Sequence, residues 1–317
     1  MDRPTDGRED PILVVLGPTA VGKTAVGVEV ARRIGGEIVS ADSRAFFVGL
    51  DVVTDKPSEA QRRGIPHHLI DTVPLCDTYD AMAFRRDVEQ LIPEIRARGR
   101  VPILAGGGTL YLSAVLRGIF EGPARDNALR ATMADRSVGG LYEQLVSVDP
   151  AAAKTIHRND RLRITRALEV FELTGRSIGT WQARAVPLPF PRLIAGLRRD
   201  RDDHRAAIAA RVRRMIDRGL VDEVRRLREE GLGPDCQAYR TIGVPEVAAF
   251  LDGRASKLEM EREITNRTWA LVRRQSAWFR REKDVSWWDV SGRDTSEVAD
   301  DIVAAWEEFL EVDDDRR

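Results

Sequence analysis

The sequence of 317 residues predicts an α/β fold, in which a parallel sheet forms the core and an all-helical segment is inserted into it. Short apolar runs alternate with amphipathic helical patterns over the first 120 residues, which is typical of a parallel sheet. These runs end in loops of glycine or small polar residues, whereas residues 123–180 carry helical patterns alone. We therefore place the core at residues 1–120 and 190–317 and the helical insertion at residues 121–189.

The first three strands are predicted at residues 12–16, 37–40 and 101–105, with helices at residues 23–34 and 80–98 between them. The loop after the first strand begins at Gly17, the second strand ends at Ala41-Asp42-Ser43, and the third is followed by Gly106-Gly107-Gly108. In a parallel sheet with right-handed crossovers all three loops lie at the carboxyl edge, where ligands bind. Farther along, we expect a strand at residues 193–197 and one long helix over residues 201–229.

Composition limits the class of protein. The chain has 43% apolar and 32% charged residues and a net charge of −1, which is typical of a folded globular protein. It has no apolar run of the length that a membrane span needs, and its N-terminus is polar and acidic, so we expect a cytoplasmic protein. Cys76 and Cys236 are far apart in sequence and show no zinc-ligand spacing, so we expect reduced, buried thiols.

The segment GPTAVGKT matches the phosphate-binding loop GxxxxGK[ST] and stands between a predicted strand and a predicted helix. The core is therefore expected to be P-loop NTPase-like. Backbone amides of such a loop bind phosphate oxygens, Lys23 neutralises charge, and the Thr24 hydroxyl can hold Mg²⁺. The predicted diphosphate-binding residues are Gly17, Pro18, Thr19, Ala20, Val21, Gly22, Lys23 and Thr24.

The loop alone names no reaction. A nucleotide hydrolase of this class needs a carboxylate at the end of a buried strand to hold the metal, but the third predicted strand ends in Ala105 and three glycines. Asp42 is the only acid at the predicted binding edge. It can form a turn hydrogen bond, or it can accept a proton from a nucleophile beside the bound phosphates.

A basic helix near the C-terminus is the clearest candidate for binding nucleic acid. At 100° per residue, Arg267, Arg274 and Arg281 form one stripe beside an apolar arc that includes Ile264 and Leu271. Such a helix can pack on the core through the arc and present guanidinium groups to phosphates.

Several longer strings show a resemblance to a known family. These are GPTAVGKT at 17–24, SADS at 40–43, PHHLID at 66–71, HRND at 157–160, TG at 174–175, and RQ at 274–275 with WFR at 278–280. In this order and spacing the chain resembles the tRNA dimethylallyltransferases, also called tRNA isopentenyltransferases, from about residue 12 to residue 289.

The resemblance implies that the loop holds dimethylallyl diphosphate, with Mg²⁺, and that the exocyclic amine of an adenosine beside the anticodon of tRNA attacks its allylic carbon. Asp42 then matches the general base, Arg211 an arginine that reaches the leaving diphosphate, and Thr109 a threonine near the bridging oxygen. It further implies a monomer that binds the anticodon stem-loop. Besides the helix stripe, the implied tRNA-binding residues are Ser43, Arg44, Ala45, Gly108, Arg130, Arg163, Arg166, Arg240 and Gln275.

The chain departs from the family pattern at a few positions. The family's Gly-Gly-Thr-x-Leu-Tyr is shifted here, so that Thr109 directly precedes Leu110-Tyr111, and the usual Gly-Thr-Ala-Lys-Pro has Asp55 in place of alanine. Ala207 stands where an arginine is expected. Three alternatives stay open: prenyl transfer to a free adenine nucleotide or other small acceptor, a P-loop small-molecule kinase, and an RNA-binding relative with weak catalysis.

Overall fold

The computed structural model describes residues 10–315 and divides into two compact units. One unit comprises the chain up to Leu112 together with the chain from Pro189 onward, and the other is Ser113–Leu188. The second unit thus begins earlier than the predicted insertion at residue 121, because α4 (Thr109–Leu116) contains the boundary. The predicted α/β class is confirmed.

The first unit is built on one parallel sheet of six strands in the order β3-β2-β4-β1-β5-β6. The strands are β1 (Ile12–Leu16), β2 (Gly36–Ser40), β3 (His67–His68), β4 (Val101–Gly106), β5 (Arg192–Arg198) and β6 (Val285–Asp289). The three N-terminal strands predicted from apolar runs agree with β1, β2 and β4 to within a residue. Strands β3 and β6 were not predicted, because β3 has two residues and β6 is only partly buried.

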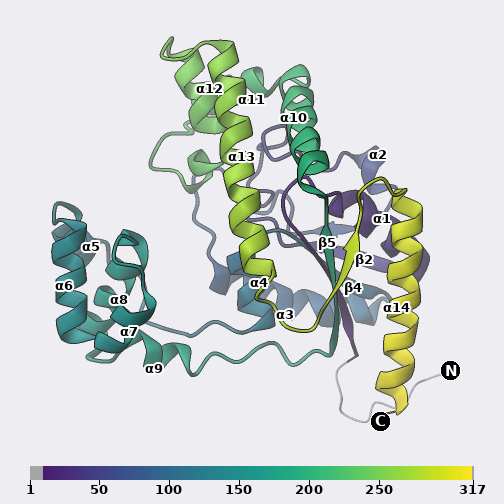
Figure 1. The fold of residues 1–317 in the computed structure, drawn as a ribbon, viewed down its shortest axis with the longest axis horizontal. Coiled ribbons are helices and arrows are strands. Elements are labelled where there is room, and N and C mark those ends of the chain that lie inside the picture. The colour runs from purple at the N-terminus through teal and green to yellow at the C-terminus, as the bar shows by residue number, and fades with distance from the viewer. Residues whose placement is uncertain (1–9, 316–317) are drawn as a thin grey trace. The chain divides into compact units, whose positions relative to one another are not determined.

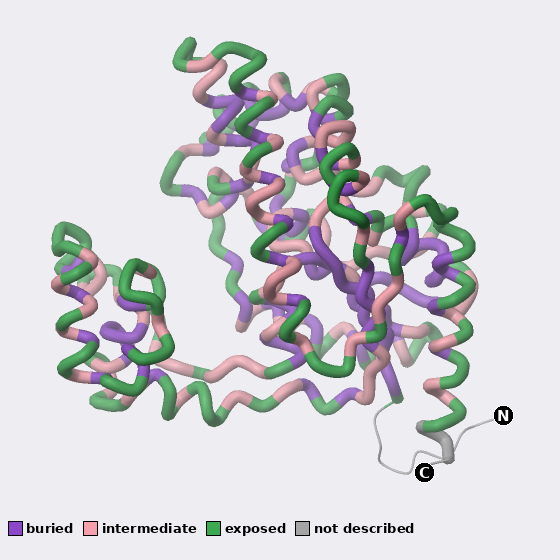
Figure 2. The backbone as a smooth tube through the Cα atoms, in the orientation of Figure 1, coloured by how far each residue is buried: buried purple, intermediate pink, exposed green. Residues whose placement is uncertain are grey.

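Helices cover the sheet and extend beyond it in Figure 1. They are α1 (Lys23–Ile34), α2 (Glu59–Arg62), α3 (Ala81–Ala97), α10 (Arg201–Asp217), α11 (Leu220–Glu229), the 3₁₀ turn η1 (Gln237–Arg240), α12 (Val244–Leu251), α13 (Lys257–Phe279) and α14 (Thr295–Asp315). Helix α14 lies against α1, and its Ile302 and Trp306 join the apolar core around β1. Figure 2 shows this core as a buried band along the strands.

The predicted helix over residues 201–229 is wrong in one respect, since it is two helices. Gly219 has φ +92° and lies between α10 and α11. A left-handed residue ends an α-helix, and glycine adopts that conformation without steric cost. The apolar spacing continues across the break, so periodicity alone did not reveal it.

The second unit contains α5 (Asn127–Ala134), α6 (Val138–Val148), α7 (Pro150–Thr155), α8 (Arg161–Thr174) and α9 (Ile178–Gln182). It has its own apolar core, which includes Leu141, Leu145 and Leu168. Aspartate or serine side chains cap the N-terminus of each of these helices. No helix among the described residues is both long and apolar enough to cross a membrane.

The prediction of two reduced, buried thiols is wrong. Cys76 and Cys236 form a disulfide with a Cα–Cα distance of 4.6 Å, and Cys76 is exposed. The loop that carries Cys76 is brought beside the segment before η1 by the fold, and a sequence separation of 160 gives no sign of this proximity.

Candidate active site

Three loops at the carboxyl edge of the sheet form the candidate site, as the parallel topology predicts. The N–H of Gly108, after β4, donates to the carbonyl of Ala41, after β2, over 2.9 Å. A Cβ atom at Gly106 would lie 2.4 Å from the Ala41 backbone, and one at Gly108 would lie 2.6 Å from its carbonyl oxygen. Glycine is therefore required after β4 for these two loops to approach each other.

The phosphate-binding loop joins β1 to α1. Gly22, with φ +110°, caps the N-terminus of α1, and the Lys23 ammonium donates to the Pro18 carbonyl over 2.8 Å. Loss of hydration lowers the pKa of Lys23 to about 8; the Asp42 carboxylate raises this pKa and the Arg211 guanidinium lowers it. The three side chains therefore share one electrostatic environment.

Two cavities open beside this loop, with volumes of about 1120 Å³ and 580 Å³. We call the larger one the donor cavity and the smaller one the acceptor cavity, after the two substrates that the sequence resemblance implies. Both are lined by Thr19, Asp42, Thr54 and Arg211. The carboxylate and the guanidinium singled out in the sequence thus lie between the two cavities.

Most of the predicted diphosphate-binding residues face the donor cavity. Thr19, Ala20, Gly22, Lys23 and Thr24 line it, whereas Gly17, Pro18 and Val21 are buried. The loop is held in this shape by two side chains from distant helices. The ring of His204 donates from Nε2 to the Thr19 carbonyl over 2.7 Å, and Gln275 accepts from the Thr19 N–H over 2.9 Å.

Asp42 follows β2 and is half-buried. Its Oδ1 accepts a hydrogen bond from the backbone N–H of Arg44 over 2.9 Å. This is the turn hydrogen bond that the sequence allowed as one possible role of Asp42. Because that bond uses one carboxylate oxygen, the residue can serve the turn and still present a carboxylate to the cavities. Ser43 and Arg44 line the acceptor cavity, and Ala45 lines the donor cavity.

Gly108 and Thr109 line the acceptor cavity, and Thr109 is the first residue of α4. Among the described residues, the lining of the donor cavity includes Gly106 but not Thr109. Thr109 thus lines the acceptor cavity, and the contact of its hydroxyl with the diphosphate that the resemblance implies stays a prediction.

Arg211 comes from α10 and is largely buried. Its Nη2 donates to the Thr54 carbonyl over 2.8 Å, and its Nε lies 3.2 Å from Oδ2 of Asp55. Sequence reasoning noted Asp55 only as a departure from a family pattern. Asp55 stands three residues after Val52, and neither its charge nor this position indicates from the sequence alone that its carboxylate pairs with Arg211.

The predicted tRNA-binding arginines divide into two groups. Arg240, Arg267 and Arg274 line the acceptor cavity. Arg267 also forms an ion pair with Glu246, whose side chain is 3% exposed. Arg281 is exposed but lies beyond Phe279, where α13 ends, so the predicted stripe on one helix holds only for Arg267 and Arg274.

The other three arginines belong to the helical unit. Arg130 and Arg166 both bind the carboxylate of Glu169, which is fully buried. Burial alone would raise the pKa of Glu169, but hydrogen bonds from the two arginines and from the Asp126 N–H lower it to about 2. Arg130 and Arg166 therefore neutralise a buried charge inside this unit. Arg163 is exposed near the start of α8, 3.3 Å from Asp160.

A second missed residue is Gln237, which also lines the acceptor cavity. Its side chain donates to the carbonyl of Tyr79 and accepts from the N–H of Tyr79, and its own carbonyl accepts from the Arg44 guanidinium over 2.9 Å. A glutamine at the start of a short 3₁₀ turn with no motif around it carries no sequence signal of such a role.

The residues present fit a magnesium ion bound together with a diphosphate. Thr24, Ser40 and Asp42, which carry two hydroxyls and a carboxylate, all line the donor cavity. Mg²⁺ prefers such oxygen ligands and takes few of them from protein when phosphates and water supply the rest. No cluster of three or more acidic, histidine or cysteine ligands occurs in the part of the chain that the structure describes.

A phosphate-binding loop with a carboxylate beside it, that of Asp42, and two adjoining cavities defines a P-loop protein suited to group transfer between two substrates. The model of the family described as IPP transferase matches residues 45–282. The chain belongs to this family.

Among curated relatives, a tRNA dimethylallyltransferase of Thermomicrobium roseum is 44% identical over 289 residues, which cover 90% of this chain and 88% of the relative. One of Pelotomaculum thermopropionicum is 36% identical over 312 residues, covering 96% and 99%. The solved tRNA isopentenylpyrophosphate transferase of Bacillus halodurans superposes with a TM-score of 0.72 at 33% identity, over 96% of this chain and 99% of that one. A eukaryotic dimethylallyltransferase acting on tRNA gives 0.78 at 25% identity, over 90% and 75%.

Proposed function

We propose that this protein transfers the dimethylallyl group of dimethylallyl diphosphate to the N6 amine of the adenosine 3′-adjacent to the anticodon in tRNA, releasing pyrophosphate. The observation that carries the proposal is the position of Asp42 and Arg211 between two cavities, beside the phosphate-binding loop. One cavity can hold a diphosphate donor and the other an acceptor base, with a carboxylate and a guanidinium where the two substrates meet. The relatives that share this chain's length carry the same activity in their names.

The donor binds in the larger cavity. Amides of the phosphate-binding loop and the Lys23 ammonium hold the diphosphate, and the Arg211 guanidinium approaches it from α10. Thr24, with Ser40 or Asp42 nearby, would hold Mg²⁺, which supplies further positive charge against the diphosphate. Positive charge fixed at this position stabilises the leaving group as the allylic C–O bond breaks.

The acceptor adenine enters the smaller cavity. Its amine must reach a carbon inside the protein, so the base has to leave the stack of the anticodon loop. The N6 lone pair forms the new bond to the allylic carbon, the carbon–oxygen bond breaks, and pyrophosphate leaves with the electron pair. Asp42 accepts the proton that the amine loses.

Binding of the RNA itself is proposed for arginines at the rim of the acceptor cavity, of which Arg240 and Arg274 are the clearest. The exposed Arg163 is the corresponding candidate in the helical unit. We expect a monomer that acts in the cytoplasm, which light scattering after gel filtration and cell fractionation would test.

A direct assay tests the proposal. The purified protein is incubated with dimethylallyl diphosphate, Mg²⁺ and an anticodon stem-loop, and the nucleosides are analysed by mass spectrometry. We expect one dimethylallyl group on the adenosine 3′ to the anticodon and none on a matched stem-loop with purine riboside, which lacks the amine. Modification of AMP in preference to the stem-loop would contradict the proposal and favour a small-molecule prenyltransferase.

Asp42→Asn tests the assignment of the base in the same assay. Asparagine can still accept the Arg44 N–H through Oδ1, so the turn is retained while the proton acceptor is removed. We expect the single-turnover rate to fall about 10²-fold or more, with little change in stem-loop binding. A rate within a few-fold of wild type would place the base elsewhere.

A further inference from the structure

Asp55 lies at the centre of a small group of charges beside the donor cavity. Its Oδ2 is 3.2 Å from Nε of Arg211, and its Oδ1 accepts a hydrogen bond from Nη1 of Arg218 over 3.0 Å. The neighbouring Thr54 carbonyl accepts from Nη2 of Arg211. Two consecutive residues thus hold two sides of one guanidinium.

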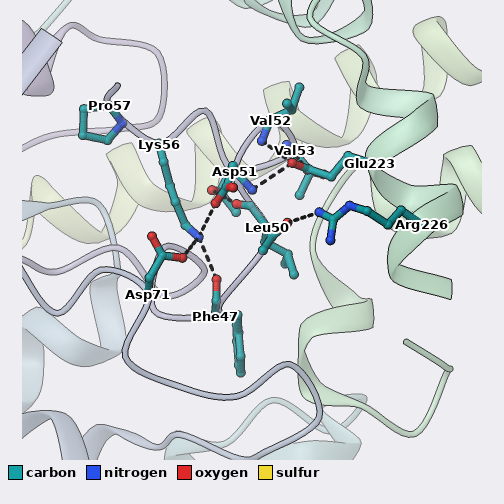
Figure 3. Close-up of polar contacts among 12 residues, drawn as sticks. Phe47, Leu50, Asp51, Val52, Val53, Lys56, Pro57, Asp71, Glu223 and Arg226 are labelled. Atoms are coloured by element: carbon teal, nitrogen blue, oxygen red, sulfur yellow. Dashed lines mark hydrogen bonds and ion pairs between the residues drawn. The ribbon is translucent and has the colours of Figure 1, made fainter. Parts of the chain in front are cut away.

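The loop that carries Asp55 is fixed from both sides, as Figure 3 shows. On one side the Glu223 carboxylate accepts the backbone N–H groups of Asp51, Val52 and Val53 at 3.0, 2.7 and 2.8 Å. On the other side the buried Lys56 ammonium donates to the Phe47 carbonyl over 2.7 Å.

The Lys56 ammonium is also paired with two carboxylates, those of Asp51 and Asp71. Because the contacts of Glu223 and Lys56 hold the loop that carries Asp55 on both sides, this loop has little freedom to move. A carboxylate on such a loop can hold a partner side chain in one place.

The Asp55 carboxylate has two effects on Arg211. It restricts a long flexible side chain to one position between the donor and acceptor cavities, which removes conformational freedom that would otherwise have to be given up during the reaction. Its negative charge also offsets part of the field of the guanidinium, so that Arg211 attracts a fully charged diphosphate less strongly than an unpaired arginine would.

We infer that Asp55 is a positioning residue for the transfer reaction: it places Arg211 for the charge that develops on the leaving group and weakens the hold of the site on free pyrophosphate. The inference rests on the proposed function, because it takes the ligand beside Arg211 to be a diphosphate. On this inference the Asp55 carboxylate both speeds the transfer step and eases the release of pyrophosphate.

Asp55→Asn tests both effects, because pyrophosphate affinity and the rate of transfer are measured separately. Asp55 has φ +56°, a left-handed conformation that asparagine tolerates better than most residues, so the backbone is retained while the charge is removed. We expect pyrophosphate, in the presence of fixed Mg²⁺, to bind about threefold or more tightly, because Arg211 regains its full field. We expect the single-turnover rate on the stem-loop to fall about tenfold, because only the Thr54 carbonyl then holds the guanidinium firmly.

The matched control is Asp252→Asn. Asp252 also binds two arginines, Arg228 and Arg254, over 2.9 and 2.8 Å, but it lines neither cavity. Asp252→Asn changes the net charge by the same amount as Asp55→Asn, and we expect it to alter neither the pyrophosphate affinity nor the single-turnover rate. Asp55→Gly, which also permits the left-handed backbone, replaces Asp55→Asn should that variant fail to fold.

The outcomes are distinct. Tighter pyrophosphate binding together with slower transfer supports the inference. Weaker binding with slower transfer would mean that Asp55 only maintains the fold, and any other combination would also overturn the inference. Failure of the wild-type protein to modify the stem-loop would contradict the proposed function. Pyrophosphate affinity is measured by titration calorimetry without RNA, so the comparison of wild type with Asp55→Asn would still test the effect of Asp55 on binding.

Discussion

The carboxamide of Gln275 links the phosphate-binding loop to the glycine loop, since its oxygen accepts the Thr19 N–H over 2.9 Å and its nitrogen donates to the Gly107 carbonyl over 2.8 Å. The side chain is buried on α13, and Gln275 lies 256 residues from Thr19 in sequence. Sequence reasoning assigned Gln275 to tRNA. The structure gives both ends of its amide internal partners, so we interpret Gln275 as a brace that holds the phosphate-binding loop and the glycine loop together.

Gln275→Met tests this interpretation. Methionine has a similar volume but can satisfy neither the Thr19 N–H nor the Gly107 carbonyl, and an unsatisfied buried group costs about 1 to 3 kcal/mol. We expect about tenfold weaker binding of dimethylallyl diphosphate by titration calorimetry. Gln144→Met, in the helical unit where Gln144 bonds to Glu172, is the control and should leave donor affinity unchanged. A defect confined to tRNA binding would restore the role predicted from the sequence.

Donor binding should depend on pH through Lys23, whose pKa is lowered to about 8. The protonated ammonium attracts the diphosphate, so affinity should be constant below about pH 8 and should fall as the pH rises above it, approaching tenfold per pH unit. A phosphate group completes its ionisation near pH 6, so the donor's charge does not change over this range. Lys23→Arg, which stays protonated, should give a flat profile from about pH 7 to 9.5. A wild-type profile that is equally flat would contradict the assignment.

The sequence predicted those parts of the molecule that local pattern determines. Apolar runs located β1, β2 and β4, and the motif located the phosphate-binding loop, because each signal lies within a few consecutive residues. Asp42 could be singled out because the parallel topology brings the ends of these strands together. The candidate site could therefore be located from local signals and one topological rule.

The features that the sequence did not reveal depend on contacts between distant segments. The resemblance implies tRNA contacts for Arg130 and Arg166, and only the fold reveals that both neutralise the buried Glu169. The break at Gly219 was hidden because the apolar face continues on α11. The positions of Thr109 and Asp55 relative to the two cavities depend in the same way on loop paths that residue types do not specify.

The Cys76–Cys236 disulfide is the clearest of these distant contacts, and it should contribute to stability. A cross-link over a sequence separation of 160 restricts the unfolded chain strongly, and the expected contribution is about 3 to 5 kcal/mol. We expect reductant to lower the free energy of unfolding in urea by this amount. The double variant Cys76→Ser, Cys236→Ser should be less stable from the start and insensitive to reductant. Equal stability of the oxidised wild type and the double variant would contradict the expected contribution of the bond.

The two arginines of α13 that line the acceptor cavity should differ in what they do. Arg274 is exposed, whereas Arg267 is paired with the buried carboxylate of Glu246, which also accepts the N–H of Gly243. Removing one partner of a buried ion pair leaves a charge without compensation. We expect Arg267→Gln to lower the free energy of unfolding by about 2 kcal/mol, since Gly243 still satisfies one oxygen.

Arg274→Gln should leave stability unchanged and weaken binding of the anticodon stem-loop. Binding of an arginine to a phosphate releases condensed counterions, so the slope of log K against log salt should become shallower by about 0.7 to 0.9 for each phosphate that the variant no longer neutralises. Measuring unfolding in urea and stem-loop binding at several salt concentrations for both variants separates the two roles. If Arg267→Gln were as stable as wild type and flattened the salt dependence as much as Arg274→Gln, the ion pair with Glu246 would be secondary and Arg267 would bind phosphate, as its place on the predicted stripe suggests.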